Sequence, residues 1–529
     1  MCLSRRLAIK SNSVNRILNF VFALFRDARN REFLLYCLPA LLVGLVLRVS
    51  LCVQMPMGIY HDDTPDFLCT ADRLLNEHKW QLHEKKTFLV PIAYTIPFLL
   101  PLPALVSIPI FQHLLGLGLI LIIGLLCRLW FTHWKWFIVP LTCATAVDPF
   151  MLWYEHTLMA ESLFVFCTAM VALAGTLYAL VPSRRRFIFL CVALFLEAGA
   201  RPEGKLLFGF GIFLVALLHA RAWRTEWRRV AIIGTIGIVT HLMTGTAQAS
   251  LLLYTSVAKM TPTDLRCAPG FDPYIASIRT DLRTRWKEQF AFPKVRDRRA
   301  VGMAVTQYLN ESPSVKNFKK KPTQSSFCLR IAMETCRRNI LALPEHVYRK
   351  FRAVALESPA GDLGKEWLFD IQREGLLGNI PLVSHLGHGL TGRAITSAED
   401  INAFVDTSYQ EIHWFNSLSA GWLNTVNRLR FPDMKIPPVP GKSMGFDYYG
   451  VPLYFAAGAL GVLAVMLHRG KLRMFHFAWG LALFGFFFVI MLTANVRPRF
   501  RFVFEPFWFI YAAMLAEVVF VGAKALIRR

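Results

Sequence analysis

Residues 33–67 read FLLYCLPALLVGLVLRVSLCVQMPMGIYHDDTPDF, an apolar run followed directly by an acidic segment. The run from 33 to 54 reaches the roughly 20 residues that a helix needs to cross a bilayer. Asp62, Asp63 and Asp66 then fall within seven residues, where the chain leaves this predicted span. We therefore predict a first membrane span that delivers an acidic loop to one membrane surface.

Composition extends this prediction to the whole chain. Of the 529 residues, 55% are hydrophobic and 18% are charged, which is typical of a mainly α, polytopic membrane protein. We predict about ten spans, at residues 33–54, 104–129, 136–147, 162–181, 187–200, 206–219, 230–254, 451–467, 474–494 and 502–523.

Several stretches need separate treatment. Runs 187–200 and 206–219 are each too short to cross a bilayer core of about 30 Å, so we predict a hairpin whose apex, 201–205, lies near the surface. Residues 90–103 contain four prolines, which predicts a loop packed at the membrane surface. Periodicity over 329–342 and 401–415 predicts helices.

Basic residues set the orientation. The leader, several short loops and the C-terminal tail are rich in lysine and arginine, which places both termini in the cytoplasm. This distribution also accounts for the net charge of +24, so we expect membrane lipids and not nucleic acid as the charged partner.

The predicted organisation has four parts. Residues 1–32 are a cytoplasmic basic leader, either an interfacial helix or a flexible tail. Residues 33–258 form a transmembrane module whose first outer loop is 55–103. Residues 259–450 form an extracytoplasmic α-rich or α+β domain, and 451–529 are the C-terminal transmembrane helices.

Two groups of residues are candidates for chemistry on the outer face. A carboxylate of Asp62 or Asp63 can act as general base, although a solvated acidic loop that caps a helix near Pro65 explains the same residues. Arg201 and the cluster Arg497, Arg499 and Arg501 suit a phosphate ligand. Snorkelling to headgroups, or pairing with a nearby glutamate, is the structural alternative for these arginines.

Four motifs, in this order, carry a family resemblance. They are Asp63 with Phe67 four residues on; 148–163, which holds Glu155, His156 and Glu161; the turn 199–204; and 498–506. Together they resemble the GT-C glycosyltransferases, in particular the protein O-mannosyltransferase and aminoarabinose transferase branch. The resemblance covers the membrane part of the chain and not the insert. Thr64 stands where this branch often has a second acid, so the base can be Asp62 or Asp63.

The resemblance implies inverting transfer of a sugar from a polyprenyl-phosphate donor to a glycan, lipid or protein acceptor. Asp63 or Asp62 would be the base. The residues implied in substrate binding are Arg201, Arg497, Arg499, Arg501, Glu161, Glu155, His156 and Lys205. No cofactor is implied, although an acidic pair can hold a divalent metal. His385 and His388 could also bind a metal, but the sequence places no third ligand for zinc beside them.

The expected location is a bacterial inner membrane, with the site facing the periplasm. Three other functions remain open from the sequence. A transporter or flippase of a lipid-linked glycan would also need arginines in a cleft, but no internal repeat is visible. An outer-face glycan ligase or polymerase would place its catalytic residue in the insert. A scaffold subunit would hold a degenerate site.

Overall fold

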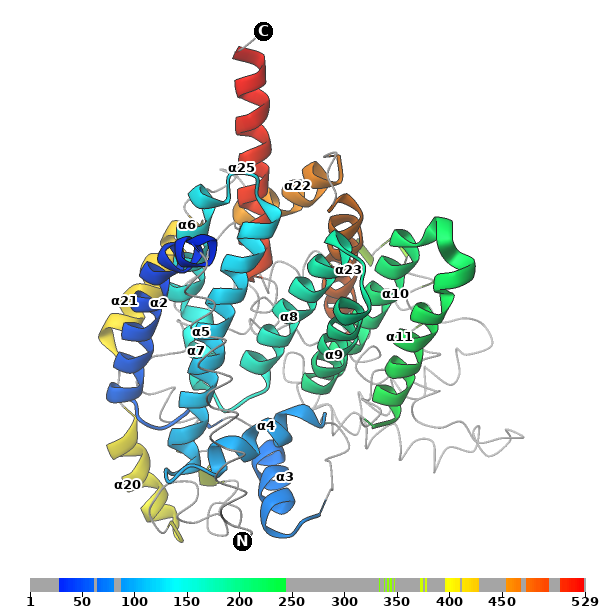
Figure 1. Cartoon of the computed structure of the whole chain (residues 1–529). Helices are drawn as coiled ribbons and strands as arrows, with labels where there is room; N and C mark the ends of the chain where they lie inside the picture. The colour runs from blue at the N-terminus through cyan, green and yellow to red at the C-terminus, as the bar shows by residue number, and fades with distance from the viewer. Residues whose placement is uncertain are drawn as a thin grey trace, which may run out of the picture.

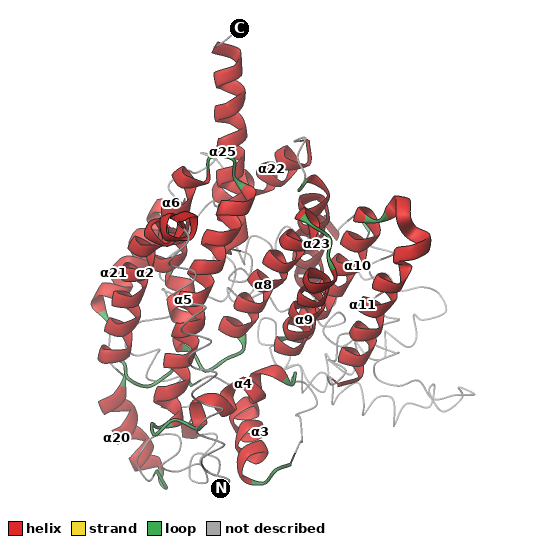
Figure 2. Ribbon diagram, in the orientation of Figure 1, coloured by secondary structure: helices red, strands yellow, loops and turns green. Residues whose placement is uncertain are grey.

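The computed structural model describes residues 28–60, 64–79, 87–243, 395–409, 412–427, 453–467, 472–493 and 505–527, with a few single positions between 333 and 377. Helices dominate this part of the chain (Figure 2), and its only strand-like pairing is an isolated bridge between Ile59 and Thr157. The leader, most of the insert and residues 244–254 lie outside the described residues.

The helices follow the apolar runs closely (Figure 1). The elements are α2 Ala28–Gln54, α3 Thr64–Asn76, α4 Leu89–Phe98, α5 Ala104–Trp130, α6 Trp134–Val147, α7 Pro149–His156, α8 Glu161–Leu180, α9 Arg184–Ala200, the 3-10 turn η1 Pro202–Lys205, α10 Leu206–Leu218, the 3-10 turn η2 Ala220–Ala222, α11 Trp223–Met243, α20 Ala398–Ser408, α21 His413–Asn427, α22 Leu453–Leu467, α23 Arg473–Thr493 and α25 Glu505–Ile527.

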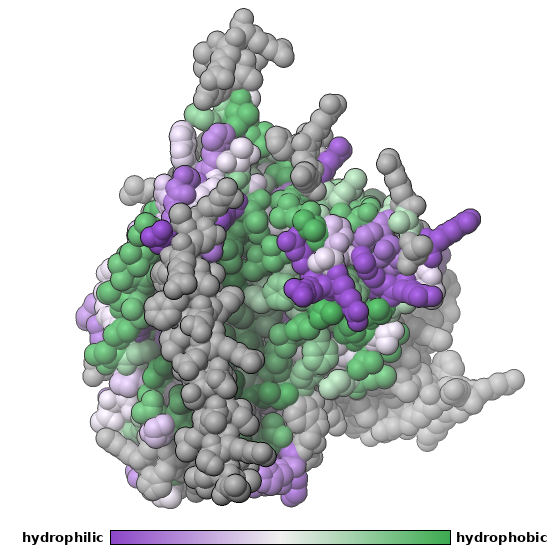
Figure 3. Space-filling model, in the orientation of Figure 1, coloured by the Kyte–Doolittle hydropathy of each residue, from purple (hydrophilic) through white to green (hydrophobic). Residues whose placement is uncertain are grey.

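Four described helices are long and apolar enough to cross a membrane, and the bent pair α6–α7 makes a fifth. The outer side of α2 is apolar as well: Leu35, Leu42, Val46 and Val53 are 54–72% exposed, which suits a helix facing lipid. Figure 3 shows apolar side chains over much of the visible face, with hydrophilic ones gathered near the end at which α10 and α11 meet. These features indicate a helical membrane protein.

The bundle core is built by helices from both ends of the chain. Contacts join α2, α5 and α6, and α8 packs against both α5 and α9. The C-terminal helices close the bundle through aromatic side chains, because Trp130 of α5 lies against Phe475 and Tyr511 at centroid distances of 5.5 and 5.7 Å. Large aromatic contacts of this kind bury much area in one place.

The prediction of a loop over 90–103 was wrong, because residues 89–98 form α4. Pro91 lies in the first turn, where an amide hydrogen has no partner within the helix in any case. Pro97 lies in the last turn, which closes with tight bonds from the Leu99 and Leu100 amides to the Ile96 and Pro97 carbonyls. The number of prolines mattered less than their positions relative to the helix ends.

One predicted helix is divided, and one predicted span is followed directly by a further helix. The helix expected over 401–415 is divided into α20 and α21 by Tyr409, which has extended backbone angles. The run 136–147 continues beyond Asp148 as α7, bent by 45° from α6. Pro149 opens α7, and the Asp148 carboxylate accepts a 2.8 Å hydrogen bond from the Phe150 amide, as an N-cap does.

Candidate functional site

One end of the bundle gathers α3, α4 and α20 (lower part of Figure 1). The segment 57–60, which leads into the acidic loop, is fixed there by its backbone. The Ile59 amide donates to the His156 carbonyl at 2.9 Å, and the Leu158 amide donates to the Ile59 carbonyl at 2.9 Å. The Gly58 amide donates to the Leu105 carbonyl at 2.7 Å. The first loop therefore starts against the junction of α7 and α8.

The chain returns to the same junction directly after the acidic pair. Thr64, the residue that follows Asp63, is buried, and its hydroxyl donates to the Leu158 carbonyl at 3.0 Å. Asp62 and Asp63 themselves lie outside the described residues. On either side of this acidic pair, Ile59 and Thr64 both bond to residues 156–158.

Arg201 reaches the first residue of α8. Its Nη1 donates to Glu161 Oε1 at 2.6 Å, and its Nε and Nη2 reach Glu203 at 3.2 Å. The guanidinium carbon lies 5.6 Å from the centre of the Phe164 ring. Its side chain is 11% exposed and that of Glu161 is 1% exposed, so this is a fixed, mostly buried cation at the C-terminal end of α9.

Helix α4, with the two residues just before it, ties the Arg201 turn to the α7–α8 junction. The Thr87 hydroxyl donates to the Ala200 carbonyl at 2.9 Å, and the Tyr94 hydroxyl donates to the Met159 carbonyl at 2.9 Å. The Phe88 ring lies 5.1 Å from that of Phe195. The predicted outer loop, the junction and the arginine turn are thus connected at one end of the bundle.

Lys205 ends η1 in the same turn as Arg201. It is half-buried, and burial lowers the pKa of its ammonium group while the nearby Glu203 carboxylate opposes this shift. Glu197, in the last turn of α9, is fully buried, and its Oε1 accepts a 2.6 Å hydrogen bond from the Thr168 hydroxyl.

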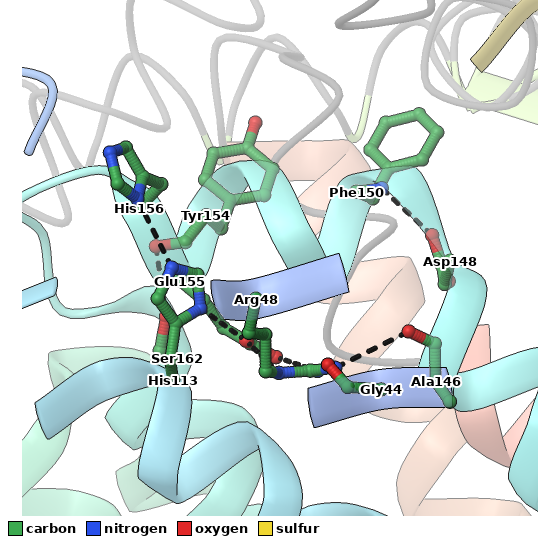
Figure 4. A network of polar contacts seen from close by, with 10 residues as sticks. All are labelled: Gly44, Arg48, His113, Ala146, Asp148, Phe150, Tyr154, Glu155, His156 and Ser162. Carbon is green, nitrogen blue, oxygen red and sulfur yellow. Dashed lines mark hydrogen bonds and ion pairs between the residues drawn. The ribbon is translucent and has the colours of Figure 1, made fainter. Parts of the chain in front are cut away.

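Glu155 and His156 belong to a buried polar network beneath the loop (Figure 4). Both oxygens of Glu155 bind Arg48 at 2.7 Å. Glu155 Oε2 also lies 2.9 Å from His113 Nδ1, and His113 Nε2 lies 3.1 Å from His156 Nδ1. His156 Nε2 contacts the Met57 carbonyl at 3.2 Å, so the network ends at the start of the first loop.

Sequence reasoning missed Arg48 and His113. Both stand in long apolar runs, where an ionisable residue is costly and usually has a partner or a function. That signal was present for both residues, but nothing in the sequence pairs either one with Glu155.

The insert also reaches the first loop. The side-chain amide of Gln372 bonds to both backbone groups of Tyr60, at 2.8 and 3.1 Å. The Tyr409 hydroxyl donates to the Gly58 carbonyl at 3.0 Å, and Trp414 Nε1 donates to Gln54 at 3.1 Å. Periodicity and composition gave no sign of these contacts.

Of the predicted site residues, the structure joins Arg201 to Glu161, places Lys205 in the same turn, and links Glu155 to His156 through His113. The positions of Arg497, Arg499, Arg501, His385 and His388 lie outside the described residues. Glu505, which follows the arginine cluster in sequence, is buried at the first residue of α25.

Comparison with known proteins adds no assignment. No protein-family model matches the chain, and no curated protein matches it significantly.

Proposed function

We propose that the chain is an integral membrane glycosyltransferase of GT-C type. It transfers a sugar from a polyprenyl-phosphate donor to a glycan, lipid or protein acceptor on the extracytoplasmic face. One observation supports this most directly: Thr64, next to Asp63, bonds to Leu158, and Arg201 bonds to Glu161, three residues further along the same junction. Thr64, the neighbour of the proposed base, and the Arg201 cation come from distant segments and bond to the same junction at one end of the bundle.

The proposed reaction uses these groups in fixed roles. Asp63, or Asp62, removes the proton from the acceptor, which attacks the anomeric carbon while the lipid phosphate leaves, with inversion. The Arg201 guanidinium, oriented by Glu161 and Glu203, offsets the charge that grows on the leaving phosphate. Among the three C-terminal arginines, at least one contributes a second cation.

The proposal includes the ten-span topology with both termini in the cytoplasm. The acidic loop, the Arg201 turn and the insert then share the outer surface, which in a bacterial inner membrane faces the periplasm. The lipid donor enters laterally from the outer leaflet. Contacts of Gln372 and Tyr409 with residues 58–60 give the insert a part in shaping the loop that carries the base.

The test is reconstitution of the purified protein in liposomes with a panel of polyprenyl-phosphate hexoses and pentoses. Released polyprenyl phosphate and transferred sugar are measured by mass spectrometry. We expect one of Asp63→Asn and Asp62→Asn to lower turnover at least about 100-fold, the scale of a lost general base. Glu77→Gln, at the end of the same outer segment, is the control and should leave turnover unchanged.

Two results would contradict the proposal. Full turnover by both aspartate variants would point to a ligase or polymerase whose catalytic residue lies in the insert. Movement of an unaltered lipid-linked sugar between leaflets, with no release of polyprenyl phosphate, would point to a flippase.

A further inference from the structure

The two imidazoles in the buried network face each other in an unusual way. His113 Nδ1 lies 2.9 Å from a carboxylate oxygen of Glu155, which can only accept while it pairs with Arg48. His113 Nδ1 therefore carries the hydrogen, and Nε2 carries a lone pair. The backbone carbonyls of Met55 and Met57 both bond to the His156 ring, and that of Met57 lies 3.2 Å from Nε2. A carbonyl can only accept, so with the hydrogen on Nε2 the Nδ1 atom of His156 carries a lone pair as well.

The two nitrogens that carry these lone pairs are 3.1 Å apart. Neutral imidazoles cannot form a hydrogen bond in this arrangement, because neither nitrogen has a hydrogen to donate. The contact requires an electrophile between the rings, either an additional proton or a metal ion. A proton alone would create a buried imidazolium beside Arg48, whose own charge is already balanced by Glu155.

A third donor distinguishes these two electrophiles. Cys52 stands one helical turn after Arg48 in α2, and its Sγ lies with His113 and His156 in a group whose ligand atoms are all within 4.8 Å of one another. Two Zn–N bonds of about 2.0–2.1 Å at a tetrahedral angle place the nitrogens about 3.3 Å apart, and a Zn–S bond of about 2.3 Å places sulfur about 3.6 Å from each nitrogen. The 3.1 Å between the two nitrogens is close to the first of these distances, and the sulfur lies within 4.8 Å of both.

The surroundings match those of a metal ligand set. Each histidine has its other nitrogen bonded to an acceptor, Glu155 for His113 and Met57 for His156. Such partners fix the tautomer and orientation of metal-binding imidazoles. A thiolate would also offset part of the charge of a divalent ion in this buried position.

We propose that Cys52, His113 and His156 bind a first-row transition metal of the zinc class, with a fourth position left for another ligand. The ion joins α2, α5 and α7 at the base of the segment that leads to Asp62 and Asp63. It acts as a structural clamp on that segment. The inference does not depend on the proposed reaction, since it rests on donor chemistry alone.

The experiment is metal analysis of the purified full-length protein, by mass spectrometry and by titration with Zn²⁺ and Co²⁺. We expect about one metal per chain and a thiolate-to-Co²⁺ charge-transfer band. The band should be lost in Cys52→Ser and kept in Cys143→Ser, the matched control, because Cys143 is a similarly half-buried cysteine in α6. Glu155→Gln should weaken metal affinity about 10–100-fold by removing the orienting carboxylate.

A second measurement avoids dependence on variant folding. In the wild-type protein, a maleimide alkylates Cys52, and mass spectrometry of the peptide that contains Cys52 follows the rate. This rate should rise at least about tenfold when a chelator removes the metal, while the rate at Cys143 stays unchanged. Absence of bound metal, no uptake of Zn²⁺ or Co²⁺, and alkylation of Cys52 unaffected by the chelator would overturn the proposal. The two imidazoles would then share a proton.

Discussion

Arg48 and Glu155 are 107 residues apart in sequence and form a forked ion pair inside the bundle. Both contacts are 2.7 Å, and the two side chains are only 3% and 2% exposed. Arg48 Nη1 also donates to the carbonyls of Gly44 and Ala146, so one side chain connects α2 to α6 and α7 (Figure 4). The pair therefore fixes how three helices meet beneath the first loop.

Removing one partner should be far worse than removing both. Arg48→Met leaves the Glu155 carboxylate buried without its cation, and we expect a loss of about 3–5 kcal/mol of unfolding free energy. Arg48→Met combined with Glu155→Gln should recover part of that loss, because the buried charge is gone. The free energies of unfolding of the wild type, Arg48→Met and the double variant, measured in one detergent, give the size of this recovery.

A matched pair at the surface gives the control. Lys135 and Glu32 also form an ion pair, but both side chains are more than 40% exposed. Lys135→Met should leave the denaturation curve nearly unchanged. If Arg48→Met were as stable as Lys135→Met, the forked pair would have no role in holding the helices together.

Gly116 in α5 makes room for the same network. A methyl group placed there would meet Glu155 Oε1 at 2.0 Å and Cδ at 2.3 Å, which no side chain tolerates. Because Glu155 is held by Arg48 and His113, it cannot move aside without breaking those bonds. We expect Gly116→Ala to lower the melting temperature and to weaken the contact between α5 and α7.

Gly234 in α11 provides the comparison for Gly116, since nothing lies within 4 Å of the position of an added methyl group. Gly234→Ala should raise stability slightly, because alanine favours a helix by roughly 0.5–1 kcal/mol over glycine. Equal melting temperatures for the two alanine variants would show that Glu155 can be displaced without loss.

The long apolar helices could be predicted from the sequence because span length and hydropathy are local properties. Three predicted spans match helices to within one residue at nearly every end: 33–54 matches α2, 104–129 matches α5 and 162–181 matches α8. The exception is the start of α2, which begins five residues earlier, at Ala28. The bend before α7 also has a local cause, Pro149. The predicted span ends at residue 147, just before this proline.

The rest depends on which segments meet. Arg48 and Glu155 each look like an isolated charge in sequence, and only the packing of α2 and α7 against α5 and α6 makes them partners. The prolines of α4 misled the prediction because their effect depends on the unknown helix ends. Contacts between Gln372 and Tyr60 span 312 residues, and no periodicity encodes them.

The stability of helix α20 should depend on pH through the carboxylate of Asp400. Its carboxylate accepts from the Thr396 and Ser397 amides at 3.0 and 2.9 Å, and the Ser397 hydroxyl accepts from the Asp400 amide in return. Backbone hydrogen bonds from Thr396, then Ser397, lower the pKa of Asp400. The stabilisation is complete above the ordinary aspartate pKa and is lost as the pH falls through the lower folded-state pKa.

Hydrogen exchange of the α20 amides, corrected for intrinsic rates, measures this. Protection should be constant at neutral pH and decline on acidification below the ordinary aspartate range. Asp400→Asn, which cannot ionise, should start from lower protection and lose this dependence. Identical pH profiles for the wild type and Asp400→Asn would mean that the capping carboxylate does not set the stability of α20.

The insert should control the loop that carries Asp62 and Asp63. Gln372 satisfies both backbone groups of Tyr60 and is itself fully buried. Gln372→Leu would leave a buried amide and a buried carbonyl without partners, at a cost of about 1–3 kcal/mol for each group. We expect faster proteolysis near residues 60–63 and, if the proposed reaction is correct, a fall in turnover.

Trp414→Phe is the matched control, because it removes an exposed hydrogen bond from the insert to Gln54 while keeping the aromatic ring. It should change neither proteolysis nor turnover appreciably. The two readouts also separate two causes. Faster proteolysis of Gln372→Leu with normal turnover would show that the insert orders the loop without positioning the base. Wild-type rates of proteolysis and of turnover in Gln372→Leu would mean that the insert does not act on Tyr60. The Tyr60 amide and carbonyl would then have found other partners, such as water.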